Sequence, residues 1–141
     1  MQATYDKTLY LIRGLPGSGK DTLGRQLGKV ISADQFFEET VDGKIIYNFD
    51  ASKIQQAHAY CKSEVKGHLQ NGYGPIAVCN TFTRLWELAF YIGLARAYSY
   101  QLVVLTVESG LTDLELEARN VHGVPATTLK AMRARWESYG L

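Results

Sequence analysis

The feature that most constrains the fold is a glycine-rich stretch near the N-terminus, GLPGSGKDT, at residues 14–22. The apolar run TLYLIRG ends at it, and apolar residues at helical spacing follow it. A strand, the pattern GxxxxGK and then a helix form the context of a phosphate-binding loop. The glycines let backbone N–H groups surround an anion, and the new helix adds its positive N-terminal end. We therefore expect a phosphate site; a glycine-rich turn without a ligand is the alternative.

The rest of the chain alternates apolar strands with amphipathic helices. After the first strand (8–14) and its helix (20–30), we expect strands at 29–34, 74–81 and 100–108, a hairpin or extended excursion at 42–50, and helices at 51–72, 84–99, 111–120 and 126–140. This alternation predicts a three-layer α/β fold with a parallel sheet of about four strands and helices on both faces. The length of 141 residues predicts a single domain, 1–141, with a lid segment around 111–125.

Composition limits the ligands and the cellular location that we expect for this protein. The formal net charge is only +1, which excludes a general basic field for nucleic acid and leaves room for a local patch. The two cysteines lack metal-ligand spacing, so reduced thiols are expected. No apolar run approaches the roughly 20 residues of a membrane span, and the first residues lack the apolar segment of a signal peptide. We expect a cytoplasmic protein without a membrane partner; the oligomeric state stays open.

Within the loop, Lys20 is expected to place its charge on the β- and γ-phosphates of ATP. Thr22 offers a hydroxyl to a further phosphate, or only satisfies its own backbone at the helix start. The expected ATP-binding residues are Gly14, Leu15, Pro16, Gly17, Ser18, Gly19, Lys20, Asp21 and Thr22.

Asp21 stands where such loops usually carry a hydroxyl that ligates Mg²⁺. A bare carboxylate about 4 Å from a phosphate charge would cost on the order of 4 kcal/mol at an effective dielectric of 20. The preferred interpretation is that Asp21 binds Mg²⁺, directly or through water. Two alternatives are that it only complements the helix dipole, or that the loop no longer turns over. The third expected strand, IAVCN, contains no carboxylate, so the metal ligand would have moved to Asp21.

The acceptor side is predicted around Asp34, at the end of the second expected strand and on the same sheet edge as the loop. Its carboxylate could take the proton of an attacking hydroxyl, or it could be an N-cap of the next helix. Phe37, with Phe36, Tyr47 and Phe49, could wall an acceptor pocket or stack a base, although such residues are more often core. Arg84 could contact an acceptor phosphate, whereas His58 is expected on a helix face.

Arginines follow the fourth expected strand. Arg119, with Asn120 and His122, precedes the turn HGVP and could close over ATP to neutralise transition-state charge. Arg133 and Arg135 are two residues apart and cannot share one helical face. The alternative for all three arginines is a solvated helix face with ion pairs to Glu115, Glu117 or Glu137.

The assembled motifs resemble the polynucleotide-kinase-like and zeta-toxin-like branch of P-loop kinases, including small phage-type domains. The matching pieces are LIRGLPGSGKDTL, ISADQFF, YNFD, AHAYC, VCNTFTRLWE, EARNVHGVP and MRARWE, which span nearly the whole chain. The resemblance implies a P-loop kinase fold, with Lys20 on the phosphates, Asp34 on the acceptor hydroxyl and Arg119 in the lid. The chain departs from the family at Asp21, where Ser is usual, and at CNTF, where DNTN is common. A Gly-Lys-Asp-Thr loop also resembles that of some phage deoxynucleoside monophosphate kinases.

The expected activity is a Mg²⁺- and ATP-dependent phosphotransferase acting on a hydroxyl of a nucleic acid or nucleotide. The resemblance points to a 5′-hydroxyl polynucleotide end or, for a phage protein, a hydroxymethylated pyrimidine in DNA. A free nucleoside or nucleoside monophosphate kinase is the second expectation. An NTP-binding module with little turnover, acting through partners, is the third.

Overall fold

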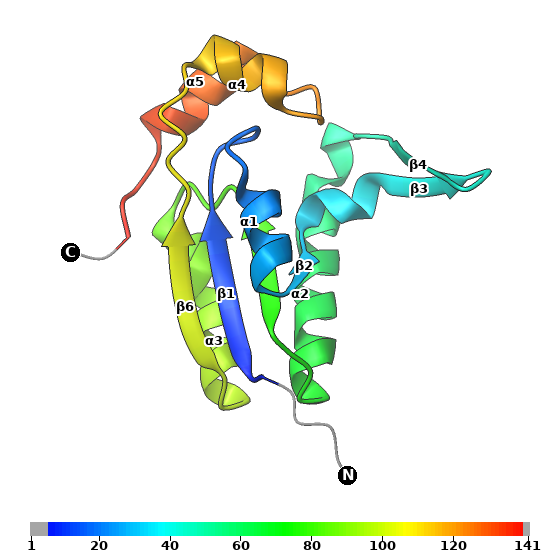
Figure 1. Ribbon diagram of the computed structural model, residues 1–141, viewed down its shortest axis with the longest axis vertical. Coiled ribbons are helices and arrows are strands. Elements are labelled where there is room, and N and C mark those ends of the chain that lie inside the picture. The colour runs from blue at the N-terminus through cyan, green and yellow to red at the C-terminus, as the bar shows by residue number, and fades with distance from the viewer. Residues whose placement is uncertain (1–5, 140–141) are drawn as a thin grey trace.

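A parallel four-stranded sheet forms the centre of the computed structural model, which describes residues 6–139 (Figure 1). Its strands are β1 (Thr8–Arg13), β2 (Lys29–Ile31), β5 (Ile76–Asn80) and β6 (Gln101–Thr106), in the spatial order β2-β5-β1-β6. β5 is wholly buried and β1 nearly so, as the continuous apolar runs predict for strands covered on both faces. The register pairs Arg13 with Asn80 and with Thr106, so these three strands end at the same level.

Helices cover both faces of this sheet, which makes the three expected layers. Helix α1 (Lys20–Leu27) covers one face, where Leu23 and Leu27 pack on Ile12 and Ala77. Helices α2 (Ile54–Gln70) and α3 (Ala89–Ala97) cover the other face and contribute to the larger core. The predicted α/β fold class is therefore confirmed. None of the helices in residues 6–139 combines the length and the apolar character that a membrane crossing needs.

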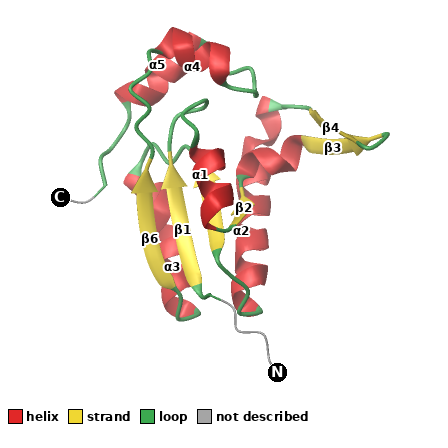
Figure 2. Ribbon diagram, viewed as in Figure 1, coloured by secondary structure: helices red, strands yellow, loops and turns green. Residues whose placement is uncertain are grey.

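The remaining elements lie beyond the carboxyl ends of the strands (Figures 1 and 2). Helices α4 (Asp113–Arg119) and α5 (Ala126–Ala134) pack on one another there. A hairpin is present but begins before the expected range 42–50: β3 (Glu38–Val41) and β4 (Lys44–Tyr47) pair antiparallel and project from the body of the molecule. The carboxyl edge of the sheet, where ligands of open parallel sheets bind, is thus covered from above by α4 and α5.

Several boundaries differ from the sequence prediction. β2 ends at Ile31, and Asp34 lies in the following 3₁₀ helix η1 (Ala33–Phe37), because Ser32 and Gln35 form a capping box that starts a helix. Short 3₁₀ helices, η2 (Ala51–Lys53) and η3 (Leu85–Leu88), precede α2 and α3. α5 ends at Ala134, whereas the predicted helix continues to residue 140. After Ala134 the chain packs against the end of β1, where the Glu137 carbonyl accepts from Arg13. Residue 140 lies outside the described residues.

Candidate active site

The glycine-rich loop has the backbone of an anion cradle. Gly17 and Gly19 take positive φ angles of 84° and 96°, which suit glycine, and α1 begins directly after them at Lys20. The Lys20 side chain is buried, although it is a cation. Gly14 allows the loop to close, because a Cβ at this position would lie 2.4 Å from the Ser18 Oγ atom. Positive-φ glycines and a helix N-terminus thus lie together where the sequence predicted a phosphate site.

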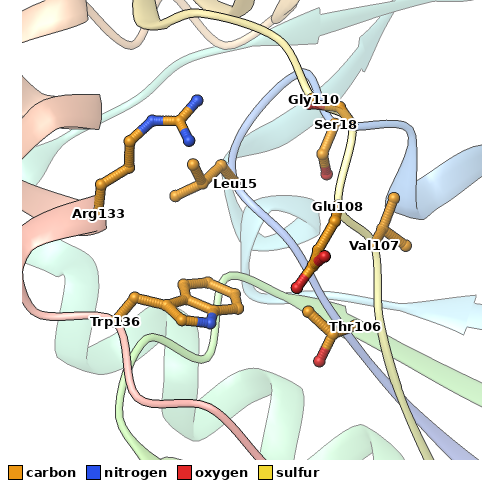
Figure 3. Close-up of a pocket in the computed structure, with 9 residues that line it drawn as sticks. Leu15, Ser18, Thr106, Val107, Glu108, Gly110, Arg133 and Trp136 are labelled. Atoms are coloured by element: carbon orange, nitrogen blue, oxygen red, sulfur yellow. The ribbon is translucent and has the colours of Figure 1, made fainter.

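The loop borders two cavities. Pro16, Gly17, Gly19, Lys20, Asp21 and Thr22 line the first, the phosphate pocket, a cavity of ≈ 200 Å³. Leu15 and Ser18 line a second cavity of ≈ 380 Å³ on the other side of the loop, together with Arg133 and Trp136 (Figure 3). The Ser18 Oγ atom is buried and has no hydrogen-bond partner among the described residues. The predicted loop residues therefore divide between two faces of the loop.

Asp21 lies in the phosphate pocket with an unsatisfied oxygen. Its Oδ1 atom is buried and accepts no hydrogen bond from any described residue. Asp21 also affects Cys79, which lies near the end of β5. Burial raises the pKa of the Cys79 thiol to about 12, and the negative charge of Asp21 adds to that rise. A buried carboxylate oxygen without a donor is costly unless a cation or donor meets it. Asp21 therefore fits a cation ligand.

Residues 6–139 hold no group of three or more His, Cys, Asp or Glu side chains that could bind a metal ion. Mg²⁺ does not require such a group, because it is commonly held by one or two carboxylates, retained waters and the phosphates of a nucleotide. The phosphate pocket offers one carboxylate, that of Asp21, so a metal there would depend on bound phosphate.

Asp34 meets two side chains from distant elements. The Tyr47 hydroxyl donates to its Oδ1 atom at 3.0 Å, and the Nδ1 atom of His122 lies 3.3 Å from its Oδ2 atom. Burial raises the pKa of the Tyr47 phenol, and the neighbouring carboxylate raises it further, so the phenol stays a donor. Asp34 does not cap η1, since Ser32 holds that position; the N-cap alternative is wrong.

Asn80, at the end of β5, supports this arrangement. Its Oδ1 atom accepts the N–H of Ala33 at 2.9 Å, and its amide donates to the Sγ atom of Cys61 at 3.6 Å. The polar residue at the strand end therefore fixes the start of η1, and through it the position of Asp34.

Asp34 and Lys20 line one large cavity of ≈ 690 Å³, the acceptor pocket. Its other walls include the aromatic residues Phe37, Tyr47, Phe49 and Trp86, together with Arg84, His58 and His122. Phe37 is also a buried core residue, whereas Phe36 packs beside Phe37 and Tyr60 and lines none of the three cavities. Phe49 and Trp86 are exposed at 53% and 74%, which leaves ring surface for a ligand.

The predicted basic residues have different surroundings. Arg119 lines the phosphate pocket from the end of α4. Arg84 lines the acceptor pocket and forms an exposed ion pair with Glu137, at 3.7 Å between Nη1 and Oε2. Arg133 pairs with Asp113 and donates to the carbonyl of Leu111, so the glutamate partners suggested for it were wrong. Arg135 instead donates to the Thr83 hydroxyl at 3.1 Å.

The segment after β6 packs directly on the glycine-rich loop. A Cβ on Gly17 would lie 2.9 Å from the Leu116 carbonyl oxygen and 3.2 Å from the Asn120 nitrogen. A capping box starts α4: the Thr112 side chain accepts from the Glu115 N–H, and the Glu115 carboxylate accepts from the Thr112 N–H. This close approach places α4 over the phosphate pocket.

Two features of the site escaped sequence reasoning. The first is the contact of His122 and Tyr47 with Asp34, which joins three segments and leaves no local signal. The second is Arg13, whose side chain is fully buried, donates to the carbonyls of Phe82 and Glu137, and lies 4.5 Å from the centre of the Trp136 ring. A charged residue inside the apolar run TLYLIRG was the available signal for Arg13.

The chain is similar to one family model and to two curated proteins. A family model described as "AAA domain" matches residues 9–139. Human NEDD4-binding protein 2 is 30% identical over 139 residues, which cover 93% of this chain and 8% of the human protein. The mouse protein named 2′,3′-cyclic-nucleotide 3′-phosphodiesterase is 26% identical over 137 residues, covering 90% of this chain and 30% of that protein. The chain therefore spans less than a third of either relative.

Two solved structures share the fold. A candidate kinase from Chloroflexus aurantiacus superposes with a TM-score of 0.60 and 18% identity, over 93% of this chain and 80% of that one. A gluconokinase from Sinorhizobium meliloti gives a TM-score of 0.56 and 13% identity, over 95% and 77%. At these identities the likeness concerns the fold alone, which is that of P-loop kinases.

Proposed function

The chain belongs to the AAA domain family and has a kinase-like P-loop fold; from that premise we propose that it transfers the γ-phosphate of ATP to a hydroxyl of a nucleic acid or nucleotide. One observation carries the proposal: Lys20 of the loop and the carboxylate of Asp34 line the same cavity. A phosphate-binding cation and a candidate base that share one cavity are what in-line phosphoryl transfer to a hydroxyl needs.

Lys20 and Arg119 supply positive charge to the donor side. Lys20 starts α1, so its buried ammonium group and the helix N-terminus act on the same anion. Arg119 lines the phosphate pocket from the opposite side, where it can neutralise charge on the transferring group. We assign both residues to catalysis, residues 14–22 to ATP binding, and the segment around 111–125 to a lid within a single domain.

Asp34 is the proposed general base. Its carboxylate takes the proton of the acceptor hydroxyl while that oxygen bonds to the γ-phosphorus and the bond from the γ-phosphorus to the bridging oxygen breaks. ADP leaves with the electrons of that bond, so atoms and charge balance. Each carboxylate oxygen has two lone pairs, so Asp34 can bind an acceptor hydroxyl while it still accepts from Tyr47.

Asp21 would hold Mg²⁺ through its unsatisfied Oδ1 atom. When bound, the ion supplies charge neutralisation at the phosphates. The residues of the loop do the remaining work of binding and orientation.

The walls of the acceptor pocket favour an acceptor that carries a nucleobase. Exposed Phe49 and Trp86 offer ring faces on which a base can stack, Phe37 forms the apolar wall behind them, and Arg84 offers a cation for a neighbouring phosphate. We therefore favour a 5′-hydroxyl end or a hydroxymethylated pyrimidine in DNA. The mouse relative is named for a nucleotide substrate, which agrees with this class.

A free nucleoside or nucleotide kinase is the second candidate. The ≈ 690 Å³ of the acceptor pocket lies within the roughly 300–1,000 Å³ range of small-ligand sites, so a monomeric acceptor would fit. A nucleotide-binding module with little turnover is the third.

The test is an acceptor panel with γ-labelled ATP and Mg²⁺. It contains oligonucleotides with 5′-hydroxyl or 5′-phosphate ends, hydroxymethyluracil-containing DNA, free nucleosides and nucleoside monophosphates. We expect label in the polymers that offer a 5′-hydroxyl end or a hydroxymethyl group, and none in the 5′-phosphate oligonucleotide. Label only in monomers selects the second candidate, and ATP binding without transfer or hydrolysis selects the third.

Asp34→Asn tests the base, with Asp42→Asn as the matched control, because Asp42 is an exposed hairpin-turn aspartate outside the three cavities. We expect Asp34→Asn to reduce kcat by about 10²–10⁴-fold with ATP affinity retained, and Asp42→Asn to change neither. An unchanged rate in Asp34→Asn would exclude the base assignment.

A further inference from the structure

The side chain of Asn120 holds the turn between α4 and α5, which carries His122, in one conformation. The Asn120 amide donates to the carbonyls of Leu116 and Val124, and its Oδ1 atom accepts the Val124 N–H at 2.9 Å. Gly123 takes a φ of +70° at the sharpest point. The Asn120 side chain thereby closes residues 120–124 into a fixed turn, and His122 lies at its centre.

His122 points from this turn into the border between the two pockets. It lines both the phosphate pocket and the acceptor pocket. Its Nδ1 atom lies 3.3 Å from the Asp34 Oδ2 atom, and its ring centre lies 4.4 Å from that of Tyr47. The side chain of His122 is 16% exposed, whereas that of Asp34 is 39% exposed. A nearly buried imidazole therefore meets a carboxylate that remains open to the pocket.

We propose that His122 is a positioning residue for Asp34, which rests on the proposed function above. We place the proton of His122 on Nδ1, the ring atom that lies 3.3 Å from the Asp34 Oδ2 atom, while the Tyr47 hydroxyl donates to the Oδ1 atom. Two donors on two oxygens fix the plane of the carboxylate, and the second lone pair of each oxygen stays available to the acceptor hydroxyl. The proton of the acceptor ends on Asp34; His122 orients and takes no proton.

The contact between His122 and Asp34 also connects the proposed lid segment, 111–125, to the proposed base. Arg119 ends α4 and lines the phosphate pocket, and Asn120 links it to the turn that carries His122. When His122 contacts Asp34, the lid arginine and the base are therefore held in one arrangement. Positioning of this kind acts on the chemical step, because misplacing a catalytic group by about 1 Å can cost on the order of 10²-fold in rate.

The kinetic test compares His122→Ala with His122→Asn. The Asn side chain can place its Nδ2–H where the imidazole Nδ1–H lies, so it retains the donor. We expect His122→Ala to lower kcat about tenfold with the KM for ATP changed less than about twofold, and His122→Asn to recover most of that kcat. His68→Ala is the control, since His68 lies near the C-terminal end of α2, beside Tyr73.

Two kinetic results would overturn the proposal. One is an unchanged kcat in His122→Ala. The other is a loss that appears only in the KM for ATP and that Asn does not restore, because this describes a lid-stabilising residue that does not position Asp34. Thermal unfolding of each variant, with and without ATP, shows whether the protein is folded.

Imidazole nuclear magnetic resonance tests the contact without turnover. With ¹⁵N-labelled histidine, we expect the His122 signals to show the proton on Nδ1 and to move in Asp34→Asn, while those of His68 stay in place. Unmoved His122 signals overturn the proposal whatever the acceptor panel shows. If the wild-type protein phosphorylates no acceptor but the signals move, the proposed function fails and the positioning role falls with it, whereas the contact itself stands.

Discussion

Replacing Gly24 by Ala tests how tightly α1, and with it the phosphate-binding loop, is seated on the sheet. Gly24 is buried on the face of α1 that meets β5. A Cβ at this position would lie 2.5 Å from the Cys79 Sγ atom and 3.0 Å from the Val30 Cγ2 atom. Real contacts to a Cβ essentially never fall below 3.0 Å, so the Cys79 side chain, the helix or the strand must move.

Two opposing terms set the magnitude. Gly→Ala inside a helix normally stabilises by roughly 0.5–1 kcal/mol. Inserting a methyl group into a packed core costs typically about 1–3 kcal/mol. We expect the steric cost to dominate and Gly24→Ala to lower the free energy of unfolding by about 1–2 kcal/mol, which lowers Tm by roughly 2–8 °C in a domain of this size. ATP binding should weaken as well, because α1 starts at Lys20.

The control is Gly67→Ala on α2, where an added Cβ meets no heavy atom within 4 Å among the described residues. This change should raise stability by roughly 0.5–1 kcal/mol, since the propensity gain stands alone. Urea unfolding followed by circular dichroism measures both variants, and calorimetric titration measures ATP binding. If Gly24→Ala stabilises the protein as much as Gly67→Ala, the packing argument is refuted.

Four further changes have expected outcomes. Gly17→Ala, at φ +84° and against the Leu116 carbonyl, should weaken ATP binding about tenfold by titration, and unchanged affinity would contradict the loop geometry. Asp21→Ala should raise the Mg²⁺ concentration for half-maximal transfer by about tenfold, and an unaltered Mg²⁺ dependence would remove Asp21 as a ligand. Trp136→Ala exposes the guanidinium of Arg13 and should cost about 1–3 kcal/mol in urea unfolding; a neutral result would deny that contact a structural role. Burial raises the pKa of the Cys79 thiol from 9.0 to about 12, so the folded state favours the neutral thiol. The contribution of this thiol to stability is complete below pH 9 and is lost as the pH rises toward 12. Cys79→Ala should therefore flatten the pH dependence of the free energy of unfolding, measured from pH 8 to 10.5.

The fold followed from local signals. Strands, helices and the capping box at Thr112 depend on side-chain periodicity and on residues three or four positions apart, so a linear reading can find them. The phosphate cradle is also local, because glycines, Lys20 and the start of α1 are contiguous. The boundary errors arose where capping chemistry overruled the apolar pattern, as at Ser32, which ended β2 before Asp34.

The sequence by itself therefore determined the layer architecture, the phosphate-binding loop and the presence of a carboxylate near it. Only the tertiary structure decided what surrounds the carboxylate of Asp34: Tyr47 contacts it from the hairpin, and His122 contacts it from the turn after α4. It also decided that Arg13 is buried against the descending C-terminal segment. The physical reason is that these contacts join segments far apart in the chain. Their distances depend on how the layers pack, which no local pattern of residues encodes.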